Sequence, residues 1–191
     1  MPEQTPPLGQ TPSQTVGPFF GYALPYAGGP DVRAPWQPDA IRVHGTVFDG
    51  AGEPVPDAIV EIWGADAAGR ASSERGSLDR DQHGFAGFGR AAVDRAGRFS
   101  FTTVKPGAMR AGSAPYLLVT VFGRGITHHL FTRAYFGDEP EANAADPLLS
   151  RIAADRRGTL VAEPDAPASY RFDVRLQGEG ETVFLDYGTE L

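Results

Sequence analysis

The residues best suited to metal or acid–base chemistry in this sequence are four histidines, and their spacing does not form a metal site. His128 and His129 are adjacent, so on one strand their side chains point to opposite faces and cannot easily bind one ion. His44 lies in a predicted strand without a nearby ligand partner, and His83 lies in a polar loop. Because neither an HxH nor an HExxH pattern occurs, the histidines indicate no metal centre.

Motifs for covalent or phosphate chemistry are equally weak. The chain contains no cysteine, which excludes a disulfide framework and thiolate metal ligands. No serine stands in a nucleophile-elbow motif, and the glycine-rich run Gly84–Gly89 lacks the lysine and the following helix of a phosphate-binding loop. By its residues alone, the chain has the size of an enzyme and no active site of its own.

Length and composition indicate one globular domain over residues 1–191, of which 41% are hydrophobic and 10% aromatic. The net charge of −7 argues against nucleic acid as a partner, because phosphate binding requires a basic face. No apolar run approaches the roughly 20 residues that a membrane helix needs, and the N-terminus does not resemble a signal peptide. We therefore expect a cytoplasmic protein that binds no membrane.

The elements that would position a site are short strands. Apolar and polar residues alternate in Arg98–Val104 and Tyr170–Gln177, and this period of two is typical of half-buried strands. Turns rich in glycine and proline separate such runs. The predicted strands are Ile41–Asp49, Ala58–Gly64, Arg98–Val104, Tyr116–Phe122, His129–Phe136, Tyr170–Gln177 and Thr182–Asp186. About seven or eight antiparallel strands predict an all-β fold, a β-sandwich.

Three segments depart from this pattern. Residues 1–38 contain nine prolines and no periodicity, so we expect an extended N-terminal arm before a sandwich at 39–191. The arm carries apolar anchors that disordered tails usually lack: Phe19, Phe20, Tyr22, Tyr26 and Trp36. Asp146 followed by Pro147 suits the start of one short helix. The polar run Ala65–Arg90 has no period, and a stretch of that length usually serves function or covers a partner.

Three segments resemble the intradiol ring-cleavage dioxygenases: Ile41–Gly69 (IRVHGTVFDGAGEPVPDAIVEIWGADAAG), Gly89–Gly107 (GRAAVDRAGRFSFTTVKPG) and Leu130–Phe136 (LFTRAYF). Thr11–Pro18 (TPSQTVGP) further resembles the start of the iron-free subunit of a heteromeric member. The resemblance implies an enzyme of this family, whose members bind a mononuclear non-haem ferric ion through two tyrosines and two histidines.

The chain departs from that family at every ligand position. The position of the first tyrosine holds Ala71, and that of the second, after a Pro-Gly pair, holds Met109. The two histidine positions match Tyr116 and Leu118. Alanine, methionine and leucine cannot replace phenolate or imidazole donors on ferric iron, and one tyrosine could not hold the ion alone. We therefore expect no catalytic and no metal-binding residue in this chain.

The resemblance also implies where the iron lies instead. In heteromeric members a homologous β subunit holds Fe(III), and the active site lies between the two chains, so we expect an αβ hetero-oligomer. The positions that would line the mouth of that site are Thr15, Gly17, Pro18 and Arg133. Gly17-Pro18 allows close approach of the backbone, and Arg133 offers a bidentate fork to a carboxylate. The expected reaction opens the ring of 3,4-dihydroxybenzoate with O₂ to give 3-carboxy-cis,cis-muconate.

Two other functions remain open on sequence alone. The chain could be a stand-alone binding or carrier sandwich of the transthyretin-like type, although Thr11–Pro18 then stays unexplained. It could also be an independent metalloenzyme that uses His128 or His129, which their adjacency disfavours. Copurification from the native host separates these three functions.

Overall fold

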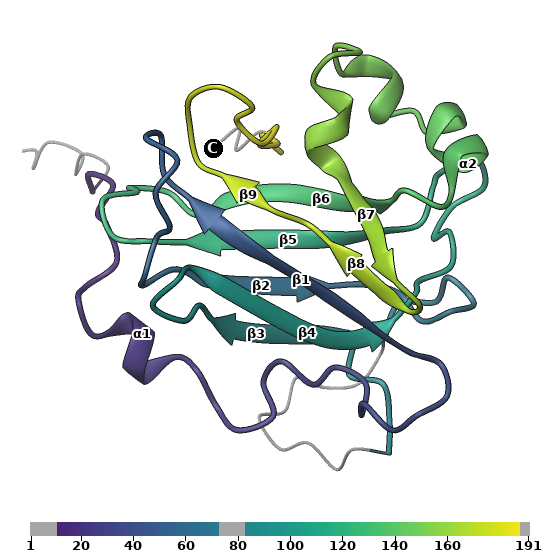
Figure 1. Ribbon diagram of the computed structural model, residues 1–191, viewed down its shortest axis with the longest axis horizontal. Helices are drawn as coiled ribbons and strands as arrows, with labels where there is room; N and C mark the ends of the chain where they lie inside the picture. The colour runs from purple at the N-terminus through teal and green to yellow at the C-terminus, as the bar shows by residue number, and fades with distance from the viewer. Residues whose placement is uncertain (1–10, 73–82, 188–191) are drawn as a thin grey trace, which may run out of the picture.

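The computed structural model describes residues 11–72 and 83–187, and its architecture is mostly β (Figure 1). The described residues form a nine-stranded sheet with the order β3-β2-β5-β6-β7-β8-β1-β4, and β9 lies beside β1. The strands are β1 (Ala40–Phe48), β2 (Ile59–Trp63), β3 (Phe88–Ala92), β4 (Arg98–Val104), β5 (Tyr116–Phe122), β6 (Leu130–Phe136), β7 (Val161–Ala166), β8 (Ser169–Arg171) and β9 (Val174–Arg175). The all-β prediction is confirmed as a fold class.

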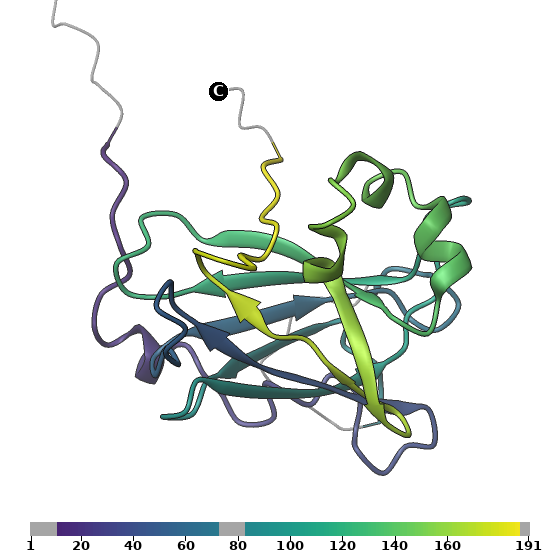
Figure 2. The ribbon, with the colours of Figure 1, turned by 45° about the horizontal axis from the view of Figure 1, so that its top comes forward.

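The sheet folds back on itself until its two ends meet. In Figure 1, β1, β8 and β9 lie in front of β2, β5 and β6. The two end strands, β3 and β4, contact each other. The result is a two-layered sandwich that is nearly closed into a barrel, with the helical segments of residues 140–160 at one side (Figure 2).

The inner faces of both layers form the core, as the alternation predicts. Phe99 and Phe101 of β4 are buried, whereas Arg98 and Ser100 are exposed. On β5, the consecutive residues Val119–Val121 are all buried, so this strand is covered on both faces. The strands that carry the clearest patterns are therefore also the centre of the packing.

Three strand pairings show that the prediction of antiparallel strands throughout is wrong. β1 runs parallel to both β8 and β9, and β6 runs parallel to β7. The pattern within one strand does not report the direction of its neighbour. Between β6 and β7 the chain passes through the helical segments, a crossover of the kind that parallel neighbours need.

The predicted strand Tyr170–Gln177 is divided into β8 and β9. Its inward side chains are buried as expected: Tyr170, Phe172 and Val174. The N–H of Phe172 donates to the carbonyl oxygen of His44 at 2.7 Å. The N–H of Thr46 donates to the carboxylate of Asp173 at 3.0 Å. A side chain thus replaces one backbone partner, and the regular pairing ends between β8 and β9.

The described helical segments are short and outnumber the single helix predicted. They are α1 (Phe20–Ala23), α2 (Pro140–Ala145) and the 3-10 turns η1 (Leu149–Arg151) and η2 (Arg157–Leu160). Pro140 is the first residue of α2, where its missing N–H costs nothing. Asp146 starts no helix and instead follows the end of α2. Its carboxylate accepts the N–H groups of Leu148 and Leu149 at 2.8 and 3.0 Å, and so holds the turn that leads into η1.

Two strands carry no clear sequence signal, and one predicted strand does not form. β3 lies at the end of the polar run Ala65–Arg90, of which residues 73–82 lie outside the described residues. β7 contains Pro164 and acidic residues that hide any alternation. Thr182–Asp186 forms no strand and makes isolated hydrogen bonds, such as that from the N–H of Leu185 to the carbonyl oxygen of Phe131 at 2.7 Å.

The N-terminal arm is docked on the sandwich, and its second half pairs with β4. Asp31 forms a bridge with Thr102 of β4, and the N–H of Arg33 donates to the carbonyl oxygen of Thr102 at 3.0 Å. Phe20 is buried, whereas Tyr22 is 86% exposed. The arm thus places one aromatic side chain in the protein and presents another to its surroundings.

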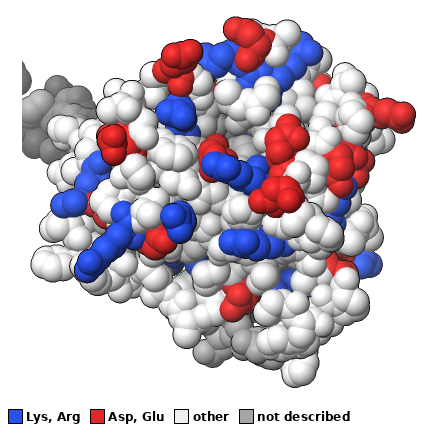
Figure 3. All heavy atoms as spheres, viewed as in Figure 1, with Lys and Arg blue, Asp and Glu red and all other residues white. Residues whose placement is uncertain are grey.

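Charged side chains of both signs are interspersed over the face seen in Figure 1 (Figure 3). Opposite charges that lie close together offset one another, so this face carries no strong electrostatic potential of either sign. Within the described residues, no helix combines the length and the apolar character that a membrane crossing requires.

We predict that Gly45→Ala destabilises the protein strongly. A Cβ atom at Gly45 would lie 1.8 Å from the carbonyl oxygen of Phe172, so β1 and the segment between β8 and β9 would have to separate. The free energy of unfolding, measured by urea titration, should fall by about 2–3 kcal/mol. Gly158→Ala is the control, because a Cβ there meets nothing within 4 Å. Equal stability of the two variants would contradict the close contact between β1 and the segment that joins β8 to β9.

Candidate functional site

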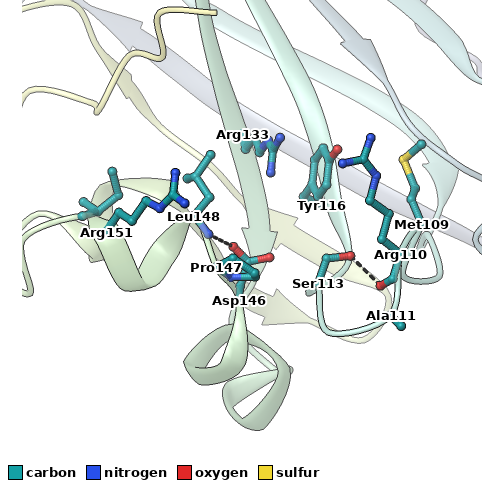
Figure 4. A pocket seen from close by; sticks show the side chains of 11 residues that line it. Met109, Arg110, Ala111, Ser113, Tyr116, Arg133, Asp146, Pro147, Leu148 and Arg151 are labelled. Atoms are coloured by element: carbon teal, nitrogen blue, oxygen red, sulfur yellow. Dashed lines mark hydrogen bonds between the residues drawn. The ribbon is translucent and has the colours of Figure 1, made fainter.

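A cavity of about 470 Å³ opens beside β5 and β6 (Figure 4). Its wall combines apolar side chains with three arginines and one aspartate. Figure 4 shows the guanidinium group of Arg133 pointing into the cavity, with Arg110 and Arg151 on opposite sides of it. Met109 and Tyr116, two of the positions matched to iron ligands, also line this cavity. The structure therefore brings three of the eight sequence-predicted positions, Met109, Tyr116 and Arg133, to one cavity.

The register of β5 and β6 explains part of this arrangement. Leu118 pairs with Arg133, and Tyr116 pairs with Tyr135. Directly opposed residues of an antiparallel pair share a face, as do residues two apart on one strand. All four side chains therefore lie on one face, which holds two of the matched ligand positions and the predicted arginine.

A close-packed glycine, Gly69, joins the two loops that carry the matched positions Ala71 and Met109. Gly69 has φ of +78°, a left-handed conformation that favours glycine. A Cβ atom on Gly69 would lie 2.2 Å from the carbonyl oxygen of Ala108. Glycine thus allows the loop that leads to Ala71 to pack on the loop that leads to Met109.

Arg133 is a half-buried charge in the wall of the cavity. Its guanidinium carbon lies 4.0 Å from the centroid of the Tyr116 ring, and its Nη1 donates to the hydroxyl of Tyr135 at 3.1 Å. Burial lowers the pKa of Arg133, but the hydroxyl groups of Tyr135 and Tyr187 outweigh burial and raise that pKa above its ordinary value. The side chain therefore stays fully charged.

Asp146 also lines the cavity, and its side chain is almost fully buried, at 1% exposure. Its carboxylate accepts four hydrogen bonds, between 2.8 and 3.1 Å long, from the N–H groups of Ala114, Leu148 and Leu149 and the hydroxyl of Tyr135. Burial raises the pKa of Tyr135 far above its usual range, so the phenol keeps the proton that it donates. Contacts thus run without a break from Asp146 through Tyr135 to Arg133.

The three predicted arm residues, Thr15, Gly17 and Pro18, do not lie at this cavity. The hydroxyl of Thr15 accepts the N–H of Gly125, in the turn between β5 and β6, at 2.8 Å. Gly17 and Pro18 follow after Val16, and none of the three predicted residues lines the cavity. A Cβ atom at Gly17 would meet nothing within 4 Å. The arm residues are therefore grouped at one turn, separate from Arg133.

His128 and His129 both line a small cavity of about 160 Å³ before β6, but their rings have different partners. Nε2 of His128 lies 3.0 Å from the hydroxyl oxygen of Ser13 in the arm. The His129 ring packs instead against two aromatic rings, with centroid distances of 5.6 and 4.6 Å, those of Phe122 and Phe131. Neither histidine lies on a strand, because β6 begins at Leu130, so the predicted start of that strand at His129 is one residue too early.

Reasoning from the sequence missed Arg110 and Arg151. Arg110 stands in the loop between β4 and β5, and Arg151 ends η1. Both are exposed, and neither forms an ion pair within the part of the chain that the structure describes. No spacing rule relates a loop arginine to one in a later helical turn, so only the fold reveals that they meet at one cavity.

Residues 37–178, well over half of the chain, match the family model described as dioxygenase. The chain therefore belongs to the intradiol dioxygenase family. A solved dioxygenase domain from Streptomyces sp. SirexAA-E has a similar fold, with a TM-score of 0.58 and 25% identity over 89% of this chain and 99% of that domain.

Relatives at the sequence level are enzyme subunits. The α chain of protocatechuate 3,4-dioxygenase from Burkholderia cepacia is 48% identical over 195 residues, covering 94% of this chain and 98% of that one. The β chain from the same organism is 34% identical over 163 residues, covering 75% of this chain and 67% of the β chain. The similarity to the α chain thus extends well beyond residues 37–178.

We predict that Asp146→Ala lowers the free energy of unfolding by at least about 3 kcal/mol, because several buried donors lose their acceptor together. Asp155→Ala is the matched control, since Asp155 is exposed and forms no hydrogen bond or ion pair with the described residues. It should change stability by less than about 0.5 kcal/mol. Urea titration of both variants decides, and similar losses would remove the structural role assigned to Asp146.

Proposed function

We propose that this chain is the iron-free α subunit of a protocatechuate 3,4-dioxygenase, a cytoplasmic αβ hetero-oligomer of aromatic catabolism. The observation that carries the proposal is the 48% identity to an α chain over nearly the full length of both chains. With an iron-bearing β subunit, the enzyme opens protocatechuate (3,4-dihydroxybenzoate) between its two hydroxyl groups with O₂, giving 3-carboxy-cis,cis-muconate. Ferric iron on the β subunit supplies the activation of the catechol towards O₂.

The residues at the matched ligand positions do not fit a ferric ion. The side chains of Ala71, Met109 and Leu118 offer no oxygen or nitrogen donor, which Fe(III) prefers. The fourth position, Tyr116, has the guanidinium of Arg133 over its ring at 4.0 Å. A fixed positive charge at that distance repels a trivalent cation and favours an anion. Under the proposal, the iron lies in the partner subunit and this chain holds no catalytic residue.

This chain contributes to the substrate site in two ways under the proposal. Gly17 and Pro18 present backbone with little side-chain bulk, and the open space around Gly17 leaves room for a partner or ligand. Thr15 anchors this part of the arm through Gly125. Arg133 supplies a permanent positive charge for the carboxylate that distinguishes protocatechuate from catechol.

Iron analysis tests whether the iron is bound by the β subunit and not by this chain. In the complex coexpressed with a β subunit, iron should be stoichiometric with the β subunit, and a phenolate-to-iron absorption band should appear. This chain, purified alone, should carry neither stoichiometric iron nor the band, because its matched positions lack donors. Iron and colour in the chain alone would show that the iron-free assignment is wrong.

Steady-state kinetics of the complex test Arg133. Arg133→Ala should reduce kcat/KM for protocatechuate by about 1.5–3 kcal/mol, the scale of a charge-assisted hydrogen bond. It should reduce kcat/KM for uncharged catechol much less, because catechol has no carboxylate. Arg133→Lys keeps the charge and should recover part of the difference between the two substrates.

Gly17→Val provides the steric comparison for the same experiment. A Cβ atom at position 17 meets no described atom of this chain within 4 Å. The variant chain should therefore keep its stability, and the complex should keep the iron of its β subunit. A bulky side chain at the mouth of the site should instead lower kcat/KM for both substrates to the same extent. Equal losses for protocatechuate and catechol in Arg133→Ala would remove the carboxylate role and leave that arginine with its structural contacts.

A further inference from the structure

The N-terminal arm hydrogen-bonds to both end strands of the sheet, and Figure 1 shows it passing beside β3 and β4. The N–H of Arg90 on β3 donates to the carbonyl oxygen of Gly29 at 2.9 Å. The N–H of Thr102 on β4 donates to the carbonyl oxygen of Pro30 at 3.1 Å. A Cβ atom at Gly29 would lie 2.7 Å from the carbonyl oxygen of Arg90, so the arm is packed closely against β3. The arm therefore has a fixed base at Gly29 and Pro30.

The side chain of Arg90 extends this contact towards α1. Its Nη1 donates to the carbonyl oxygen of Leu24 at 2.9 Å, and its guanidinium carbon lies 5.9 Å from the centroid of the Tyr26 ring. Leu24 is the residue at which α1 ends. The last carbonyl groups of a helix have no partner within the helix, and a basic side chain can bind them. An arginine from β3 thus caps the C-terminal end of the helix in the arm.

Glu61 fixes the orientation of this arginine. It stands on β2 directly opposite Arg90, and its Oε1 accepts a hydrogen bond from Nε of Arg90 at 2.7 Å. Both side chains are mostly buried, at 16% and 21% exposure. The guanidinium group is a rigid fork, so a contact at Nε sets the direction in which Nη1 points. Because desolvation offsets much of the attraction in a buried ion pair, net stability does not by itself account for the pair.

The helix α1 connects this contact to the predicted arm residues. Gly17 accepts the N–H of Phe20, the first residue of α1, at 3.1 Å. Phe20 is buried, which holds the middle of the segment on the protein. On the other side, Thr15 is bound to the turn between β5 and β6 through Gly125. A displacement of α1 at Leu24 would therefore also displace Gly17.

We infer that Arg90, oriented by Glu61, is a positioning residue for the substrate site that the two subunits share. Arg90 holds the C-terminal end of α1, and α1 in turn keeps Gly17 and Pro18 in place before substrate binds. The inference rests on the proposed function, because that function puts Gly17 and Pro18 at the mouth of the site. A segment that is already ordered costs no ordering free energy when a ligand binds, so its release should weaken substrate binding more than turnover.

Arg90→Lys in the αβ complex separates positioning from stability. Lysine keeps a positive charge for Glu61, but its single ammonium group lacks the fork that also reaches Leu24. The urea midpoint should therefore stay close to that of wild type. KM should rise about two- to fivefold for protocatechuate and for catechol alike, while kcat changes by less than about twofold.

Lys105→Met is the control for the loss of an ion pair outside the arm. Lys105 is partly buried, and its ion pairs with Asp138 and Glu139 involve no arm residue. This variant should lower the urea midpoint and leave KM for both substrates unchanged. A rise in KM as large as that of Arg90→Lys would show that any loss of packing has this effect, and the inference would be wrong.

Hydrogen exchange of α1 in the same complexes gives a readout that needs no turnover. The N–H groups of Ala23 and Leu24 are bonded within α1. They should exchange about three- to tenfold faster in Arg90→Lys than in wild type or Lys105→Met, because local opening becomes easier. The inference requires faster exchange and a raised KM together, so either change without the other contradicts it. If the wild-type complex does not cleave protocatechuate, the proposed function fails and the role at the substrate site falls with it, whereas faster exchange would still show that Arg90 holds α1.

Discussion

The cavity of this protein depends on one buried carboxylate. Asp146 accepts hydrogen bonds from the loop before β5, from β6 and from the turn that it caps. A buried carboxylate is costly unless its oxygens are satisfied, so all three segments must stay within reach of the same two atoms. Through Tyr135, this carboxylate also positions Arg133, which covers the ring of Tyr116. The wall is thus set by a polar network as well as by apolar packing.

That network explains how a fold shared with dioxygenases can present a cationic cavity. Met109 and Tyr116 stand at positions matched to metal ligands, and Arg133 occupies the same face. The sign of the local field decides which ligand is favoured: guanidinium groups attract carboxylates and repel a ferric ion. Under the proposed function, the scaffold is retained while the wall of this cavity favours anions, since function is determined by the site and not by the fold.

Local patterns predicted much of the fold, whereas Arg133 of the candidate site was named only through the family resemblance. Arg98–Val104 and Tyr116–Phe122 match β4 and β5, because alternation and continuous apolar character are properties of a single strand. The parallel pairings were not predictable, since the direction of a neighbour depends on the crossover between them. In the same way, Arg133 lies in a recognisable motif, whereas Arg110 and Arg151 become neighbours only through the fold.

The parallel pairing of β1 with β8 and β9 has a consequence for biosynthesis. Thr46 and Asp173, which are joined across this seam, stand 127 positions apart in the sequence. A ribosome therefore releases β1 long before its C-terminal neighbours exist. β4 can pair with one edge of β1 early, but the other edge must stay unpaired for most of translation. Contacts between such distant segments slow folding and expose intermediates to aggregation. The yield of this protein in a cell should consequently depend on how well chaperones protect its first strand until synthesis ends.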